Sequence, residues 1–264
     1  DKVVTYNHNV GETIEELVES CQRSVEEGWK VIRWGLAHQK GTVFEPRPAV
    51  RRAIKEFQAV REAVGDDIEI CMDVHTRITL ADAVTLCREV EPFRPYFMED
   101  PLRVENAQSY RNLRSRTNVP LAVGEQYSSK WDFRQIIEEE LTDYARVDLC
   151  VCGGLSEAKK IAGWCETHYI DLAVHNPIGP VATSAFLHLC LSIPNFAVQE
   201  LPRRPGDSMP DVVLNQPVWK DGYLLPPEAP GLGIEFNREA IKQYPFEITE
   251  LPHLHRTDGS VTNW

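Results

Sequence analysis

Three acidic residues, each at the end of a short apolar run, recur at equal spacing in the sequence: Asp73, Glu99 and Glu125. The interval fits one strand, one helix and two short connections, so the acids are predicted to end three successive strands of a βα repeat. Neighbouring parallel strands would bring the carboxylates together, and a hard cation such as Mg²⁺ prefers oxygen ligands with positions left open for water or substrate. Solvated acids near helix starts are the alternative, but the equal spacing favours a metal site.

Two histidines could act beside such a metal. His75 follows Asp73 by two positions, and the strand period would place both side chains on the same face. His175 ends the seventh predicted strand, and Asp148 lies within the sixth, so the carboxylate could contact the imidazole. Such a pair fixes the ring tautomer and stabilises the charged ring, which makes His175 a candidate general base. A hydrogen-bonded polar residue and a structural Asp–His pair are the respective alternatives.

Four further polar residues lie on predicted strands or just beyond them. Glu200, at the end of the eighth predicted strand, would project over the same end of the strands as the three acids. Arg33 lies inside the second predicted strand. His8 and His38 lie at or just past the ends of the first two strands, where a substrate contact stays open.

Strand and helix patterns alternate from the first residues to about position 201. The predicted strands are Val3–His8, Lys30–Gly35, Ile68–His75, Tyr96–Glu99, Leu121–Glu125, Tyr144–Leu149, Asp171–His175 and Phe196–Glu200. The predicted helices are Thr13–Glu27, Ala49–Val64, Leu80–Val90, Asn106–Arg116, Trp131–Leu141, Leu155–Thr167 and Val181–Leu191.

This order predicts an α/β protein with a (β/α)₈ TIM-like barrel over residues 1–201, whose active site lies at the C-terminal ends of the strands. An open doubly wound sheet is the alternative, but Asn9-Val10-Gly11 is not the Gly-rich loop that would make it nucleotide-binding. Residues 202–264 form a Pro/Gly-rich extension, which is expected to pack on the barrel because it carries Trp219 and Trp264.

Composition narrows the class of partner. A net charge of −12 argues against nucleic acid or an anionic membrane surface. No stretch approaches the roughly 18 apolar residues of a membrane span. Seven scattered cysteines indicate a reduced, cytoplasmic protein, and we expect a homo-oligomer. The chain starts at Asp1 with neither Met nor a signal sequence, so its natural N-terminus is expected to be missing.

Together these residues resemble the barrel domain of the enolase superfamily, and within it the mandelate-racemase-like acid-sugar dehydratases, meaning galactonate and mannonate dehydratases. The resemblance covers nearly the whole chain, although the N-terminal capping domain of that family is absent from it. The motifs that carry the resemblance are Asp73-Val74-His75-Thr76-Arg77, Met98-Glu99-Asp100-Pro101, Val123-Gly124-Glu125, Trp131-Asp132-Phe133, Gly153-Gly154-Leu155, residues 194–200 and residues 258–264.

The resemblance implies Mg²⁺-dependent dehydration of a sugar acid, an aldonate, to a 2-keto-3-deoxy sugar acid. Mg²⁺ would bind to the three acids, and His175, paired with Asp148, would remove the C2 proton. His75 would protonate the departing C3 hydroxyl. Glu200 and Arg33 would contact the substrate.

Departures from the family pattern narrow the subgroup. The alternative lysine bases of the superfamily are absent, because Val31-Ile32-Arg33 and Asp148 occupy their positions, which disfavours a racemase or epimerase. The loop 41–44 lacks the tyrosine of the mannonate dehydratases, and those enzymes have no acid at the place of Asp148. We therefore expect galactonate- or gluconate-like stereochemistry at C2. The absent cap keeps one rival open: a barrel that binds metal and sugar acid but turns over poorly, as a regulatory protein or a fragment. A racemase or epimerase of the same superfamily is the other alternative.

Overall fold

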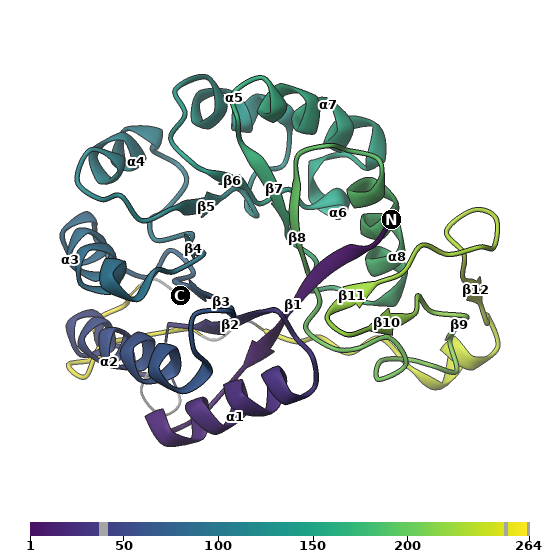
Figure 1. Cartoon of the computed structure of the whole chain (residues 1–264), viewed down its shortest axis with the longest axis horizontal. Coiled ribbons are helices and arrows are strands. Elements are labelled where there is room, and N and C mark those ends of the chain that lie inside the picture. Colours follow the sequence, from purple (N-terminus) through teal and green to yellow (C-terminus); the bar gives the residue numbers. More distant parts are fainter. Residues whose placement is uncertain (37–41, 251–252, 263–264) are drawn as a thin grey trace.

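The computed structural model describes residues 1–36, 42–250 and 253–262. Within them, eight parallel strands form a closed ring, because each pairs with the next along the chain and β1 also pairs with β8. Figure 1 shows this ring surrounded by helices. The predicted (β/α)₈ barrel is thus confirmed. The strands are β1 (Val3–Asn9), β2 (Val31–Gly35), β3 (Glu69–Asp73), β4 (Phe97–Glu99), β5 (Leu121–Val123), β6 (Tyr144–Ala145), β7 (Asp171–Val174) and β8 (Phe196–Glu200).

Seven helices lie where the sequence predicts them, on the outside of the ring. Three of them begin at a residue whose side chain caps the helix, namely Thr13, Thr79 and Asn106. In the first helix the Thr13 side chain accepts the N–H of Glu16, and the Glu16 carboxylate accepts the N–H of Thr13, which makes a capping box. Each helix turns one apolar stripe toward the strands, as Leu17 and Cys21 do in the first. The helices are α1 (Ile14–Glu26), α2 (Pro46–Val64), α3 (Leu80–Val90), α4 (Ala107–Arg114), α5 (Lys130–Glu138), α7 (Leu155–Glu166) and α8 (Pro180–Leu191), with a 3₁₀ turn η1 (Glu91–Phe93) after α3.

An additional short helix, α6 (Leu149–Cys152), replaces the end of the predicted sixth strand. β6 ends at Ala145, so Asp148 does not lie inside a strand, and that prediction is wrong. Instead Asp148 is the N-cap residue of α6, where its Oδ1 accepts the N–H of Cys150 at 2.7 Å. A carboxylate is favoured at this position because it satisfies a backbone donor that the helix leaves unpaired.

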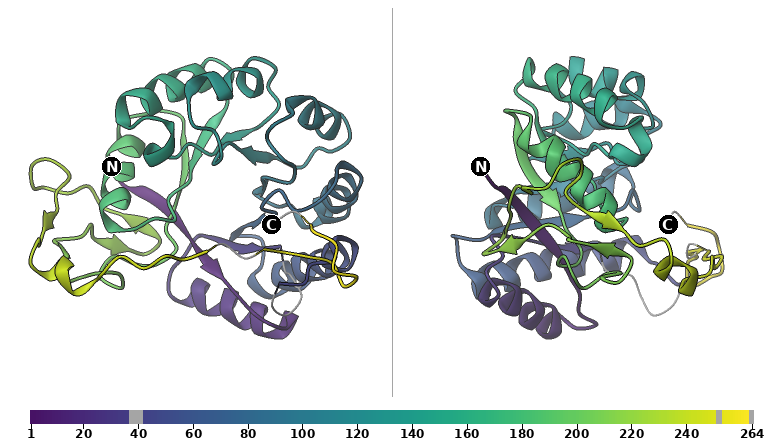
Figure 2. Two further views of the ribbon diagram at one scale, coloured as in Figure 1. Left: turned by 180° about the vertical axis from the view of Figure 1, so that it is seen from behind. Right: turned by 90° about the vertical axis from the view of Figure 1, so that its right-hand side faces the viewer.

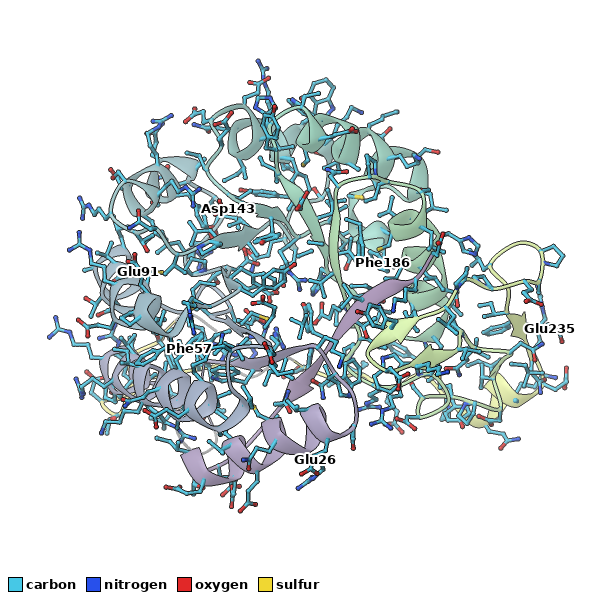
Figure 3. All side chains as sticks on the ribbon, viewed as in Figure 1. Glu26, Phe57, Glu91, Asp143, Phe186 and Glu235 are labelled. Atoms are coloured by element: carbon cyan, nitrogen blue, oxygen red, sulfur yellow. The ribbon has the colours of Figure 1, made fainter. Side chains whose placement is uncertain are left out.

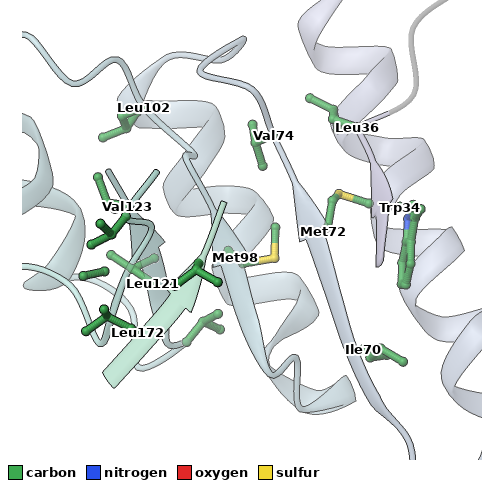
Figure 4. Close-up of a cluster of buried hydrophobic side chains, with 14 of the residues drawn as sticks. Trp34, Leu36, Ile70, Met72, Val74, Met98, Leu102, Leu121, Val123 and Leu172 are labelled. Carbon is green, nitrogen blue, oxygen red and sulfur yellow. The ribbon is translucent and has the colours of Figure 1, made fainter. Parts of the chain in front are cut away.

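Side chains on the strands alternate between the helices and the inside of the ring. Those that face the helices form the main core, and Figure 4 shows Trp34, Met72, Met98 and Val123 among them. The inside carries an apolar layer of Tyr6, Val31, Cys71, Phe97, Ala122, Ala173 and Val198. Two positions further along the chain from six of these seven residues come polar residues, namely His8, Arg33, Asp73, Glu99, His175 and Glu200. The apolar layer therefore fills the inside of the barrel below the polar residues, which lie at its mouth, the C-terminal ends of the strands.

Side chains fill the space between strands and helices, as Figure 3 shows. Phe57 of α2 and Phe186 of α8 are fully buried there, whereas Glu26 and Glu235 lie at the surface. No helix in the described part of the chain has both the length and the hydropathy to cross a membrane.

The chain after β8 first packs against the start of β1. The hairpin β10 (Trp219–Lys220) and β11 (Tyr223–Leu224) extends the sheet antiparallel to Val3 and Val4. Trp219 packs on Trp29 with ring centroids 4.6 Å apart and donates a hydrogen bond to Thr5 Oγ1 at 3.0 Å. This contact lies at the opposite end of β1 from the mouth.

The rest of the extension forms a small lobe and then crosses the molecule. β9 (Val213–Leu214) pairs with β12 (Glu235–Phe236), and η2 (Ala240–Gln243) follows. The chain then runs to the α2 side, as Figure 2 shows, where His255 forms a bridge with Val43. The extension therefore contacts the barrel in two separate places.

Candidate active site

The three acids predicted to bind a metal lie together at the mouth of the barrel. Asp73 and Glu99 are the last residues of β3 and β4 and are direct partners in the ladder. Glu125 lies two residues beyond the end of β5. One carboxylate oxygen of each lies within 4.8 Å of the others, so a single cation could contact all three.

Gly124 lets the chain turn so that Glu125 faces the mouth. Its φ of 134° is one that residues with a side chain rarely adopt. A Cβ at this position would lie 2.5 Å from Cε1 of Phe133, a buried residue of α5. The turn therefore requires glycine both for its backbone angle and for its close approach to α5.

The donor set fits a hard cation. Both oxygens of Glu99 and the Oε2 of Glu125 are buried, and the described arginine and histidine nitrogens near them form ion pairs rather than aligned hydrogen bonds. Burial raises the pKa of Glu125 well above its ordinary value, and the negative charges of Asp100 and Glu99 raise it further. A cation bound among these carboxylates would relieve their mutual repulsion, and all-oxygen ligation is what Mg²⁺ prefers.

Two buried arginines offset part of this negative charge. Arg33 forms an ion pair with Asp73, and its Nε lies 3.6 Å from Glu99 Oε2. Arg146 is fully buried, with Nη2 2.5 Å from Glu99 Oε1 and 3.8 Å from Glu125 Oε2. Burial alone would raise the pKa of Glu99, but the attraction of Arg146 and Arg33 outweighs it, so that the pKa lies below its ordinary value.

His175 and Asp148, both selected from the sequence, are in contact. His175 Nδ1 lies 2.8 Å from Asp148 Oδ2, the oxygen that α6 leaves available. The ring's other nitrogen, Nε2, lies 3.4 Å from Glu125 Oε2. Asp148 thus holds one side of the ring while the other side faces the three acids, which is the geometry of an oriented base.

His75 also reaches the acids, but not by the predicted route. β3 ends at Asp73, and His75 and Thr76 have φ of 52° and 57°, so a turn replaces the expected continuation of the strand. The turn is stabilised because Asp73 Oδ1 accepts the N–H of His75 at 2.8 Å. The imidazole Nε2 lies 2.6 Å from Asp73 Oδ2. Burial, and then the positive charges of Arg33 and Arg77, lower the pKa of His75 to about 4.

Glu200 is buried at the end of β8, and its oxygens are already engaged. Oε2 accepts from Arg146 Nη2 and from the N–H of Asn176, each at 2.9 Å. Oε1 lies 2.6 Å from His8 Nε2. His8 therefore joins the cluster from β1. His38, for which the sequence likewise left a substrate contact open, lies outside the described residues.

Sequence reasoning missed two members of the cluster. Arg146 precedes Asp148 by two positions inside an apolar run. A charged residue within a predicted barrel strand is unusual, and this could have identified Arg146 as part of the site. Asp100 follows Glu99 directly and is fully buried. Its pKa is raised to about 8, first by burial and then by the charge of Glu99.

Comparison with known proteins gives consistent matches over this architecture. The family model "Enolase C-terminal domain-like" matches residues 16–240. A D-mannonate dehydratase of Caulobacter sp. strain K31 is 35% identical, and the match covers 99% of this chain and 71% of that protein. A "D-galactonate dehydratase family member" of Halomonas elongata is 32% identical, over 100% of this chain and 72% of that protein.

Solved structures agree with this. An enolase from Pantoea ananatis with bound D-gluconate and magnesium superposes with a TM-score of 0.92 at 28% identity, covering 100% of this chain and 72% of that one. An enolase from Agrobacterium radiobacter with bound sodium and L-malate has a TM-score of 0.90 at 28% identity, covering 100% and 71% of the two chains.

Proposed function

The chain belongs to the enolase C-terminal domain-like family, and from that premise we propose that it is a hydro-lyase that removes water from a sugar acid. The product would be a 2-keto-3-deoxy sugar acid. Similar proteins named mannonate or galactonate dehydratases support this reaction class. The observation that carries the proposal is the placement of the His175–Asp148 pair beside three clustered carboxylates.

Asp73, Glu99 and Glu125 would hold the Mg²⁺. When bound, the ion supplies positive charge to a substrate carboxylate, which makes the proton on the adjacent carbon easier to remove. The protein contributes the fixed position of the three acids, which the ladder between β3 and β4 and the turn at Gly124 impose.

We assign removal of the C2 proton to His175 Nε2. Because Asp148 Oδ2 accepts from Nδ1, the proton of the neutral ring stays on Nδ1 and Nε2 is free to accept. After the transfer the carboxylate stabilises the charged ring. Asp148 is itself held by the N–H of Cys150, so the base has a fixed orientation before substrate binds.

Loss of the C3 hydroxyl is assigned to His75. Its lowered pKa, about 4, makes the ring neutral at pH 7, because Arg33 and Arg77 oppose a charge that burial already disfavours. A neutral ring donates a hydrogen bond to the leaving oxygen but needs a proton before it can release one. The protonated His175 is the alternative source of that proton.

Glu200 and Arg33 act mainly by organising this site. The Arg33 guanidinium offsets the charge of Asp73 and Glu99, and Glu200 fixes Arg146 and His8. For the stereochemistry at C2 we propose a galactonate- or gluconate-like acid rather than mannonate, because the His175–Asp148 pair supplies the base and loop 41–44 has no tyrosine.

A panel of aldonates and other sugar acids, incubated with Mg²⁺ and assayed for 2-keto-3-deoxy products, tests the function. Product that forms with Mg²⁺ and disappears with a chelator supports it. Exchange of the C2 proton with solvent deuterium and no loss of water would instead indicate an epimerase. Metal binding with neither reaction would indicate a binding protein.

Comparing His75→Asn with wild type then resolves the proton donor. If His75 supplies the proton, the variant exchanges the C2 proton with solvent but eliminates slowly. If His175 carries out both transfers, elimination persists in the variant.

A further inference from the structure

A polar cavity of about 340 Å³ lies beside the proposed metal site. Its wall is formed by the end of β1, the connection from β7 to α8 and part of the extension after β8. His8, Asn176, Arg203 and Arg204 are among the polar side chains that line it. None of the assigned acids or catalytic histidines lines this cavity.

The cavity is contiguous with the catalytic cluster. His8 contacts Glu200 Oε1 at 2.6 Å, and Asn176 is the residue after His175 and donates its N–H to Glu200 Oε2 at 2.9 Å. A sugar acid held by its carboxylate at the metal has a polar far end that must lie somewhere around the mouth. His8 and Asn176, which line the cavity, are direct neighbours of Glu200 and His175. The cavity is therefore well placed to hold the far end of the substrate.

The charge of the cavity is opposite to that of the protein. The chain carries a net charge of −12, yet no Asp or Glu is among the residues that line this cavity in the described part of the chain. Arg204 is paired with Glu27 and lies over the Trp219 ring. Arg203 is exposed and has no ion pair or hydrogen bond to any described side chain, so its guanidinium remains available.

Two further groups point to a polar ligand. Asn176 is 1% exposed, and its Nδ2 donates to the Glu200 carbonyl oxygen and to Thr183 Oγ1, yet its Oδ1 has no partner among the described residues. The carbonyl partner fixes the amide orientation, so the oxygen is the unused atom. The N-terminus of the twelve-residue α8 borders the same cavity and has no side-chain cap, so it favours negative charge.

We propose that this cavity binds the far end of the substrate and that Arg203 selects sugar acids carrying a second anionic group there, either a carboxylate or a phosphate. Asn176 Oδ1 would accept a hydrogen bond from a hydroxyl next to that group. A terminal –CH₂OH would leave the guanidinium of Arg203 without a partner, whereas an anion would form a charge-assisted hydrogen bond. This inference rests on the proposed function, since it names the substrate class of that site.

The test compares D-gluconate, D-glucarate and 6-phospho-D-gluconate, which share their configuration from C2 to C5 and differ at the far end. D-galactonate and D-galactarate are measured beside them. Binding is measured by calorimetry with Mg²⁺ present, and product formation is measured separately. The comparison is repeated with Arg203→Ala, with Arg203→Lys, and with Arg116→Ala, an exposed arginine after α4 that serves as the control.

We expect at least one acid with an anionic far end to bind about tenfold or more tightly than its –CH₂OH counterpart, as a charge-assisted hydrogen bond would give. Arg203→Ala should abolish most of this affinity preference, and Arg203→Lys should retain part of it. Arg116→Ala should leave the preference unchanged. The carboxylate and phosphate compounds show which anion is preferred.

Equal binding of the neutral-ended acids, a preference that survives Arg203→Ala, or no binding at all would overturn the inference. Turnover of the neutral-ended acids without any preference would leave the proposed function standing while removing this inference. A preference in binding without any product would leave this inference standing while removing the proposed function.

Discussion

At the proposed metal site, three carboxylates face two guanidinium groups. Asp73, Glu99 and Glu125 carry up to three negative charges, which Arg33 and Arg146 balance only in part. Buried charges are stable only when they are paired, so the remaining negative charge favours binding of a cation. Glu99 contacts both arginines and is therefore the centre of this arrangement.

Glu99→Gln should weaken the binding of Mg²⁺ or Mn²⁺ by about 100-fold or more, since loss of a group that only supports a ligand already costs about 10–100-fold. The amide keeps the shape of the side chain and removes its charge. Titration calorimetry measures the effect, with the exposed Glu228→Gln as a matched control. Equal affinity in wild type and Glu99→Gln would exclude Glu99 as a ligand.

Spacing and strand ends pointed to most of the clustered residues, because a βα repeat brings equally spaced strand ends together. Arg146 was not found in this way. It directly follows the two-residue strand β6, in the middle of the predicted strand Tyr144–Leu149, and its long side chain brings its charge to Glu99 and Glu200. How far a side chain reaches across a barrel is set by the closed ring and is not visible in a linear pattern.

At the scale of elements, the periodicity of apolar residues predicted the eight strands of the barrel and seven of its helices. It did not predict how each strand ends. His75 lies in a turn with positive φ, and Asp148 caps the short helix α6. Both details depend on local hydrogen bonds from Asp73 and Asp148 to backbone N–H groups. Apolar runs such as Leu149–Cys152 suit strand and helix equally, so period alone could not separate them.

Gly124→Ala should lower the free energy of unfolding by about 2–5 kcal/mol, through backbone strain and the clash of the new methyl group with Phe133. Gly163→Ala is the matched control. It lies in α7 with no atom within 4 Å of the new Cβ, and it should stabilise the protein by about 0.5–1 kcal/mol. Urea denaturation measures both. Equal stabilities for the two variants would contradict the role given to the turn.

Glu56 in α2 gives a pH dependence of stability. Burial raises its pKa despite the nearby charge of Arg52, which lies 2.7 Å from Oε1. Because the folded-state pKa exceeds the unfolded one, the folded state favours the protonated acid, and stability is lost as pH rises through the folded pKa.

Glu56→Gln removes that loss. The melting temperature of the variant relative to wild type should therefore increase as pH is raised from 4 to 7, as followed by thermal melts across that range. A variant that becomes steadily less stable than wild type over the same range would show that the ion pair with Arg52 outweighs burial.

At the scale of the whole molecule, the extension is joined to the barrel at two distant points. The hairpin β10–β11 extends β1 at its first residues, and His255 reaches Val43 near the start of α2. Aromatic content predicted that the extension packs on the barrel. Its positions could not be predicted, because they depend on contacts such as Trp219 with Thr5 that are far apart in sequence.

Trp219→Ala should reduce the free energy of unfolding by about 2–4 kcal/mol, because it removes a half-buried ring that stacks on Trp29. Metal affinity should remain unchanged, since this contact lies at the end of β1 remote from the mouth. Denaturation and metal titration on the same sample separate the two effects. A large loss of metal affinity at full stability would contradict this separation.

The central claim is that His175 removes the C2 proton beside a metal held by the three acids. It is tested by following a turned-over sugar acid in deuterated water with Mg²⁺, with wild type and with His175→Asn. We predict that the variant loses C2 exchange and elimination by about 10²–10⁴-fold while its Mg²⁺ affinity is nearly unchanged. Elimination by His175→Asn at the rate of wild type would contradict the account.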